Sequence, residues 1–194
     1  MKKIILVTFL SFAFISYSQI AAYHMVYVKA EDQPKFESIE KNYMSKMAQA
    51  AVNDGQFSYW ALEKLIHPMV PIGGKLNFGL VGNWYQFVIV YPNMKSYLNS
   101  GPWWANAGEK LGVPQEMLSY NAEQGGMYVW TIEDSVFGSQ PAKFSVYNFG
   151  FAEEAQTFLD NQKPYMKNFE NQMKKNEKGR AGWVSGHRLS PKNF

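Results

Sequence analysis

Two parts of the chain begin with alternating apolar and polar positions and then change to a spacing of three to four. Residues 23–29 and 143–149 alternate and are rich in β-forming side chains, which predicts a strand in each. The spacing after each strand predicts an amphipathic helix. The apolar positions with this spacing are Phe36, Ile39, Tyr43, Met47 and Ala50 in the first part and Phe158, Tyr165, Phe169 and Met173 in the second.

A glycine follows each predicted helix, and a second strand comes after it. Gly55 and Gly179 stand where a helix commonly ends, because glycine adopts the left-handed conformation without steric cost. Residues 57–65 and 182–189 are then predicted to be strands, each with a central tryptophan. The order strand, helix, strand is therefore expected twice.

The first part continues beyond these three elements. Residues 68–82 contain Pro and Gly and are expected to form a loop, and residues 83–91 a strong strand. Residues 94–111 are expected to form a second helix, broken at a Gly-Pro pair, and residues 127–132 a fourth strand. The order β-α-β-β-α-β is that of a ferredoxin-like unit, so the predicted fold class is α+β.

An internal repeat relates the two parts. Matching residues are 122 positions apart in the helices (152 minus 30) and 123 apart in the second strands (183 minus 60). We therefore expect a tandem duplication, with a first unit at residues 22–135 and a partial second unit at residues 142–194. The identical pairs include Ala30 and Ala152, Phe36 and Phe158, Lys41 and Lys163, Tyr43 and Tyr165, Met44 and Met166, and Trp60 and Trp183.

The second unit stops at Phe194, before its third strand is due. An unfinished sheet has open edges, which folded proteins usually cover. Two explanations stay open: the chain is a fragment, or another subunit, as in a homodimer, supplies the missing half.

The first eighteen residues have the three parts of a secretory signal peptide. Two lysines precede an apolar run at residues 4–15. Ser16 and Ser18 then place small residues at the positions that favour cleavage before Gln19. The mature protein is therefore expected to be periplasmic or secreted, with no membrane span after the signal.

Composition excludes several classes of function. Two of the 19 Lys and Arg belong to the signal. The mature chain therefore has 17 basic and 16 acidic residues, and its net charge is 17 minus 16, or +1. This balance gives no electrostatic case for nucleic acid or an anionic membrane as a partner. The basic residues near the end of the chain are interrupted by glutamates, which is typical of a solvated helix face. The absence of Cys excludes thiolate nucleophiles and Cys-bound zinc, and leaves a packed core as the source of stability.

The order β-α-β-β-α-β, the aromatic strands around Trp60 and Trp130, and the duplication together resemble the dimeric α/β-barrel superfamily. This superfamily includes antibiotic-biosynthesis monooxygenase-like and NIPSNAP-like domains. The resemblance extends loosely over residues 22–194 and concerns the fold, since no motif of one member family is present. It implies two ferredoxin-like units packed sheet against sheet around a space that often holds a small ligand or haem.

Residues from both halves are candidates for the walls of such a space. Even spacing along a strand places Trp183 and His187 on one face. The same spacing places Trp60 and Lys64 together in the first unit. The competing interpretation is that the tryptophans are core residues under a helix and that His187 is a surface residue. The candidate ligand-binding residues are Trp60, Lys64, Trp183, His187, Tyr27 and Tyr147.

Few residues suggest catalysis. His24 and His187 are candidate acid–base groups, because few other side chains titrate near neutral pH. Glu63 points to the face opposite Trp60 and could act as a base in an apolar cavity. The three His lie on separate elements without a metal-binding spacing, so no metal is expected. No cofactor is indicated, although a single His would suffice as the axial ligand of a haem.

We expect an exported protein that holds a small apolar or aromatic ligand between two ferredoxin-like halves. One alternative is a cofactor-independent oxygenase-like enzyme that uses His187 or His24. Another is a structural or interaction protein that presents a tryptophan to a partner. Adjacent residues of a helix point in different directions, so one of Trp103 and Trp104 should pack inward and the other outward.

Overall fold

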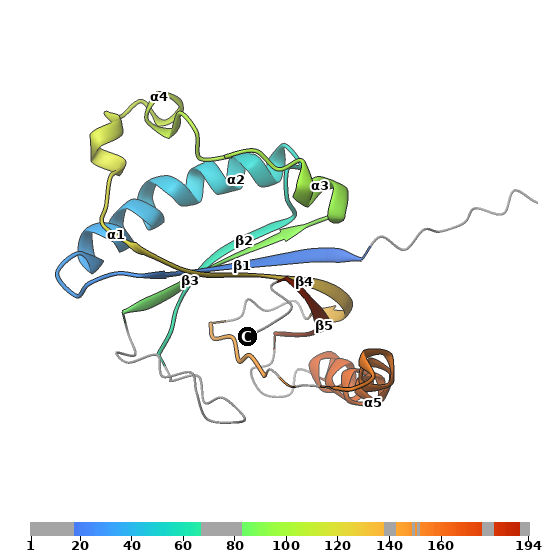
Figure 1. Cartoon of the computed structure of the whole chain (residues 1–194). Coiled ribbons are helices and arrows are strands. Elements are labelled where there is room, and N and C mark those ends of the chain that lie inside the picture. Colours follow the sequence, from blue (N-terminus) through green and yellow to red (C-terminus); the bar gives the residue numbers. More distant parts are fainter. Residues whose placement is uncertain are drawn as a thin grey trace, which may run out of the picture.

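Five strands and five α-helices make up the described part of the chain (Figure 1). The strands are β1 (Gln19–Tyr27), β2 (Tyr59–Lys64), β3 (Trp84–Tyr91), β4 (Glu123–Phe137) and β5 (Gly182–Ser190). The helices are α1 (Gln33–Ile39), α2 (Ser45–Asn53), α3 (Met94–Leu98), α4 (Ala107–Leu111) and α5 (Ala155–Lys174), with a π-helical turn (Glu40–Met44) between α1 and α2 and a 3-10 turn (Gln115–Leu118) before β4. The computed structural model describes residues 18–66, 83–137, 143–148, 150, 152–175 and 181–190.

The strands form one antiparallel sheet in the order β2-β3-β1-β4-β5. β1 lies in the middle of the sheet, where Ala22 stands opposite Ile89 of β3 and Val129 of β4. Residues 19–137 contain the predicted order β-α-β-β-α-β, and the α+β fold class is confirmed. The duplication stays a prediction.

The outer face of the sheet, as we call the face that carries α1 to α4, has a core of small and aliphatic side chains (Figure 1). Ile20 and Ala22 of β1 are buried there against Ala48 and Ala51 of α2. Small side chains on both elements let the helix lie close to the sheet, which keeps the packing dense.

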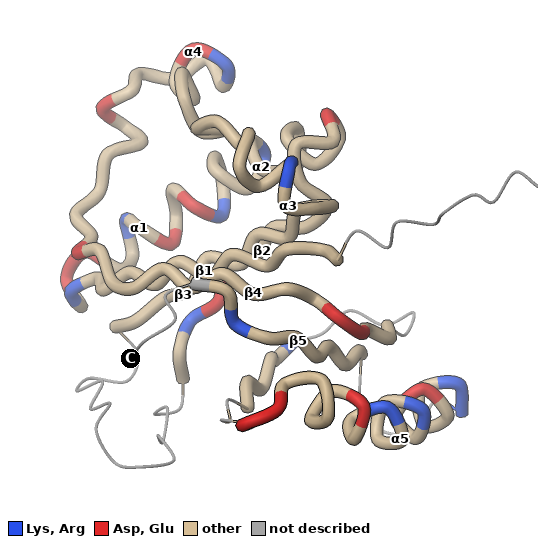
Figure 2. Tube along the Cα trace, turned by 45° about the vertical axis from the view of Figure 1, so that its right-hand side comes forward, with Lys and Arg blue, Asp and Glu red and all other residues tan. Residues whose placement is uncertain are grey.

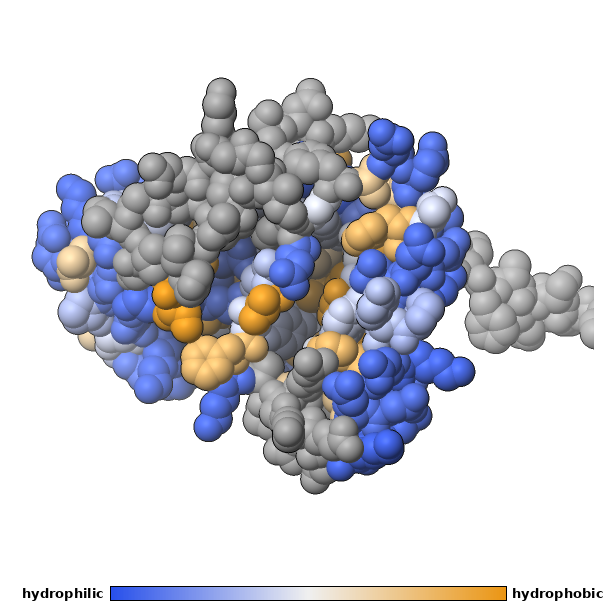
Figure 3. All heavy atoms as spheres, turned by 90° about the horizontal axis from the view of Figure 1, so that it is seen from below, coloured by the Kyte–Doolittle hydropathy of each residue, from blue (hydrophilic) through white to orange (hydrophobic). Residues whose placement is uncertain are grey.

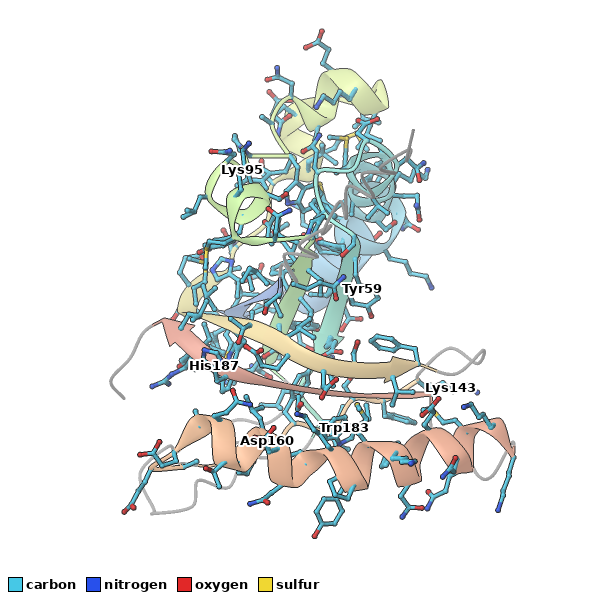
Figure 4. All side chains as sticks on the ribbon, turned by 90° about the vertical axis from the view of Figure 1, so that its right-hand side faces the viewer. Tyr59, Lys95, Lys143, Asp160, Trp183 and His187 are labelled. Atoms are coloured by element: carbon cyan, nitrogen blue, oxygen red, sulfur yellow. The ribbon has the colours of Figure 1, made fainter. Side chains whose placement is uncertain are left out.

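The outer face continues across the sheet to β5. Ile20 stands opposite Thr131 of β4, and Thr131 stands opposite His187 of β5. α5 lies on the side of the sheet away from α1 and α2 (Figure 1). β4 is long and curved, and α5 packs against β4 and β5, with Trp183 between β5 and α5 (Figures 1 and 4).

The inner face is the opposite side of the sheet. Residues 143–148 lie beneath it (Figure 1). The predicted strand at 143–149 is wrong for these residues, which have no regular secondary structure. A strand needs a partner for its backbone hydrogen bonds, and alternation alone does not supply one. The other predicted strand of the second unit is confirmed as β5, which extends the first sheet by pairing with β4.

The helical predictions hold with changes at the ends. Gly55 has a φ of +72° and follows α2, as expected of a glycine that ends a helix. Residues 94–111 form the two short helices α3 and α4, with the predicted break between them. Trp103 packs into the core between the sheet and the helices, whereas Trp104 is exposed, so the expected division of the pair is confirmed.

Basic and acidic residues both occur along α5 (Figure 2). Lys163 pairs with Asp160 at 2.6 Å, and Lys174 pairs with Glu170 at 2.6 Å. These exposed pairs agree with the predicted solvated helix face. None of the helices in the described part of the chain is long and apolar enough to cross a membrane. The predicted signal peptide, apart from Ser18, and the loop at 68–82 lie outside the described residues.

The π-helical turn begins with a buried acid. Glu40 is 2% exposed and is hydrogen-bonded by Tyr120. Burial raises the pKa of Glu40 to about 7, against a smaller opposite effect of the Tyr120 hydrogen bond. Glu40 stands four residues after the buried Phe36, so α-helical spacing places it on the apolar side of the helix.

This acid makes the stability of the fold depend on pH. The unfolded chain loses the Glu40 proton near pH 4.5, but the folded protein keeps it until about pH 7. The free energy of unfolding is therefore expected to fall between these values as pH rises. Glu40→Gln removes the effect, so at pH 8 the variant should be more stable than wild type, by up to about 3 kcal/mol. Urea unfolding at pH 4 and pH 8 measures the difference.

The exposed carboxyl of Glu116 serves as the control, because Glu116→Gln should change stability little at either pH. A gain from Glu40→Gln of the same size at pH 4 and pH 8 would contradict burial of a titrating Glu40.

Candidate ligand-binding site

Side chains of β1, β2 and β3 form a patch on the inner face. Alternation along β2 places Tyr59, Ala61 and Glu63 on this face. The strand register sets Ala61 opposite Val88, and Val88 opposite Tyr23 of β1. The patch thus has a floor of two small aliphatic side chains with tyrosines and a carboxylate around it.

Residues 143–148 cross this patch. Their side chains alternate, with Ser145 and Tyr147 turned to the sheet. Phe144 is 75% exposed and Val146 is 83% exposed, so both point away from the sheet. Seen from below, apolar side chains gather around the middle of the inner face (Figure 3).

The carboxylate of Glu63 holds the segment to the sheet. The Ser145 hydroxyl donates to Oε1 at 2.7 Å, and the Tyr147 hydroxyl donates to Oε2 at 2.8 Å. The side-chain amide of Gln86 approaches Oε2 at 3.4 Å. The Tyr147 ring also meets the Tyr23 ring edge-on, with centroids 5.6 Å apart. We call this group the Glu63 cluster; it consists of Glu63, Gln86, Tyr23, Tyr59, Ser145 and Tyr147.

The pKa values of the three tyrosines in the cluster are raised. Burial, and then the charge of Glu63, raise the pKa of Tyr23 to about 12. The same two causes, in the same order, raise the pKa of Tyr59 and of Tyr147. These hydroxyls therefore stay protonated at neutral pH and serve as hydrogen-bonding groups.

Two of the predicted ligand-binding residues of the first unit lie on the outer face. Trp60 packs beneath α2, with its ring 6.2 Å from that of Trp103. Lys64 forms an ion pair with Glu37 at 2.9 Å and lies 5.3 Å from the centre of the Tyr85 ring. Hydrogen bonds from Tyr85 and from Lys64 lower the pKa of Glu37. Trp60 and Lys64 are thus separated by the sheet from the Glu63 cluster.

The two described histidines also belong to the outer face. The His24 ring lies 6.2 Å from Phe87, a residue that packs toward α1. His187 places Nδ1 2.9 Å from the Thr131 hydroxyl and 3.0 Å from Glu133 Oε1. This geometry orients an imidazole, but in the described part of the chain no side chain is hydrogen-bonded to its Nε2.

The remaining predicted residues are divided between the faces. Trp183 lies between β5 and α5, on the side of the sheet that α5 covers (Figure 4). Tyr27 is on the inner face, four residues along β1 from Tyr23, and its ring contacts Trp84. The structure therefore brings together Glu63 and Tyr147 and keeps the other candidates away from them. His67 lies outside the described residues.

Four members of the Glu63 cluster were not predicted from the sequence. Tyr59 could have been found, because it shares the parity of Glu63 along β2. Tyr23 and Gln86 could have been placed on a face once the strand register was known. Ser145 had no sequence signal, because its contact joins segments 82 residues apart.

A hollow lies elsewhere, between the turn after α2 and the region of α3. Its volume is about 610 Å³, it is open to solvent, and its lining includes Gln56, Asn93, Lys95 and Ser96. None of the predicted site residues lines it. In the parts of the chain that the structure describes, no group of three or more His, Asp or Glu is arranged to hold a metal ion.

The charge of Glu63 predicts a measurable coupling within the cluster. Glu63→Gln removes the charge and should lower the pKa of Tyr23 from about 12, though burial will keep it above its ordinary value of 10.0. NMR titration of tyrosine ring-carbon signals would follow the change. Tyr85 is the internal control, because burial and Glu37 raise its pKa, and it should not respond. An unchanged pKa of Tyr23 in Glu63→Gln would show that the charge of the carboxylate does not act on this tyrosine.

Comparison with protein families finds no family model that matches the chain, and comparison with curated proteins finds no match either. The function is therefore argued from the chemistry of the site.

Proposed function

We propose that this chain is an exported binding protein of the tandem ferredoxin-like type, which holds a small apolar or aromatic ligand against the inner face of its sheet. The observation that carries the proposal is the convergence of Tyr23, Tyr59 and Tyr147 around Glu63. Tyrosines combine a large apolar ring with a hydrogen-bonding tip, a combination suited to holding a small organic molecule.

The pairing of β4 with β5 supports the tandem arrangement. In a duplicated protein, β5 is the second strand of the second unit, as β2 is of the first. Trp60 and Trp183 then hold equivalent places, each beneath the helix that precedes its strand. Residues 143–148, the start of the second unit, lie across the inner face, where two packed units would enclose a ligand.

The arrangement of acid–base groups favours binding over catalysis. His24 and His187 lie on the outer face, on the side of the sheet opposite the Glu63 cluster. On the inner face, the hydroxyls of Tyr23, Tyr59 and Tyr147 have raised pKa values and stay protonated near neutral pH. The patch therefore offers recognition groups, with Glu63 as its carboxylate.

A neutral fluorescent aromatic molecule, N-phenyl-1-naphthylamine, tests the binding proposal. We expect enhanced fluorescence on binding to wild type and at least a tenfold weaker affinity in Tyr147→Ala, which loses a ring and a hydrogen bond. Tyr165→Ala is the matched control, because Tyr165 is 65% exposed on α5. If Tyr147→Ala binds the molecule as tightly as Tyr165→Ala does, the inner face is not the binding site.

The start of the sheet supports export with cleavage before Gln19. β1 begins at Gln19, and Ile20 is already 2% exposed, so cleavage there leaves the whole sheet intact. We expect the protein recovered from the periplasm or medium of a producing cell to begin at residue 19, as shown by intact mass. A mature form that begins after Ile20 would contradict this, because it would lack part of the core.

A further inference from the structure

In the part of the chain that the structure describes, the carboxylate of Glu63 is held by hydrogen bonds and by no ion pair. Its three donors, Ser145, Tyr147 and Gln86, are uncharged. Across the described ranges, no Lys, Arg or His forms an ion pair with it. A carboxylate has about four acceptor positions, so capacity for a further partner is left.

Lys64, the next residue of β2, shows the contrast. It lies on the outer face and pairs with Glu37 at 2.9 Å, so the nearest cation along the chain is already engaged on the other side of the sheet. The charge of Glu63 nevertheless acts on its surroundings, because it contributes to the raised pKa of Tyr23, Tyr59 and Tyr147. A field that disfavours negative charge on three neighbouring hydroxyls favours positive charge at the same place.

The neighbours of this carboxylate on the same face of β2, Ala61 and Tyr59, are partly exposed. Tyr59 and Glu63 lie on the same face with only the methyl group of Ala61 between them. Adjacent side chains on one face of a strand are about 7 Å apart, so Tyr59 and Glu63 stand about 14 Å apart at the backbone. Tyr59 is 52% exposed.

We infer that the inner-face site selects an organic ammonium ion, which would lie over Ala61 with Glu63 as its counter-ion and the rings of Tyr59 and Tyr147 beside it. Ammonium groups are attracted both by carboxylates and by the faces of aromatic rings. This inference rests on the proposed binding function and names the class of ligand.

A pair of ligands of the same shape isolates the charge. Phenyltrimethylammonium carries the cation, and tert-butylbenzene is its uncharged counterpart. Their affinities for the full mature chain are measured by ligand-observed NMR, at low and at high salt. Wild type should bind the cation about tenfold more tightly at low salt, and the preference should shrink as salt screens the charge.

Two variants locate the charge that matters. Glu63→Gln should abolish the preference for the cation over tert-butylbenzene. Glu116→Gln removes the same charge from an exposed site on the helical side and should keep the preference. Thermal unfolding of both variants confirms that each is folded.

The outcomes separate the two proposals. Equal affinity for both ligands in wild type, or an unchanged preference in Glu63→Gln, overturns the ammonium inference and leaves the binding function in place. Failure of wild type to bind either ligand or the neutral fluorescent molecule overturns the binding function itself.

Discussion

β1 is hydrogen-bonded along both edges, and the remaining elements depend on this double pairing. Its neighbours β3 and β4 come from later parts of the chain, so one strand joins them into a sheet. Because side chains alternate along a strand, β1 contributes to both faces of the sheet. Ile20 and Ala22 anchor α2 on the outer face, and Tyr23 forms one wall of the site on the inner face. A change in register would exchange these faces and remove the core and the site together.

Neighbouring residues of β2 show two ways to accommodate charge in a sheet. Lys64 is neutralised by Glu37 and lies among polar groups of α1. Glu63, one position earlier, is surrounded by hydroxyl and amide donors. Hydrogen bonds satisfy the oxygen atoms but leave the charge in place.

The sequence predicted what alternation and helical spacing determine locally. The opposite faces of Trp60 and Glu63 follow from a period of two, and the order of elements in the first unit follows from the change of period. The predicted strand at 143–149 was wrong for 143–148, because no partner strand is provided for it in the described part of the sheet. Glu40 was missed although it stands four residues after Phe36, because only apolar side chains were assigned to the buried face. The contact of Tyr147 with Glu63 joins residues 84 apart and has no local signal.

The position of β1 has a consequence for the order of folding. Gln19 pairs with Ile132, which is 113 residues later (132 minus 19), so the central strand cannot be completed until most of the chain is available. Folding that waits for such distant pairings is slow compared with folding through local contacts. Under the proposed export, β1 would cross the membrane before β3 and β4, and the sheet would assemble only after passage.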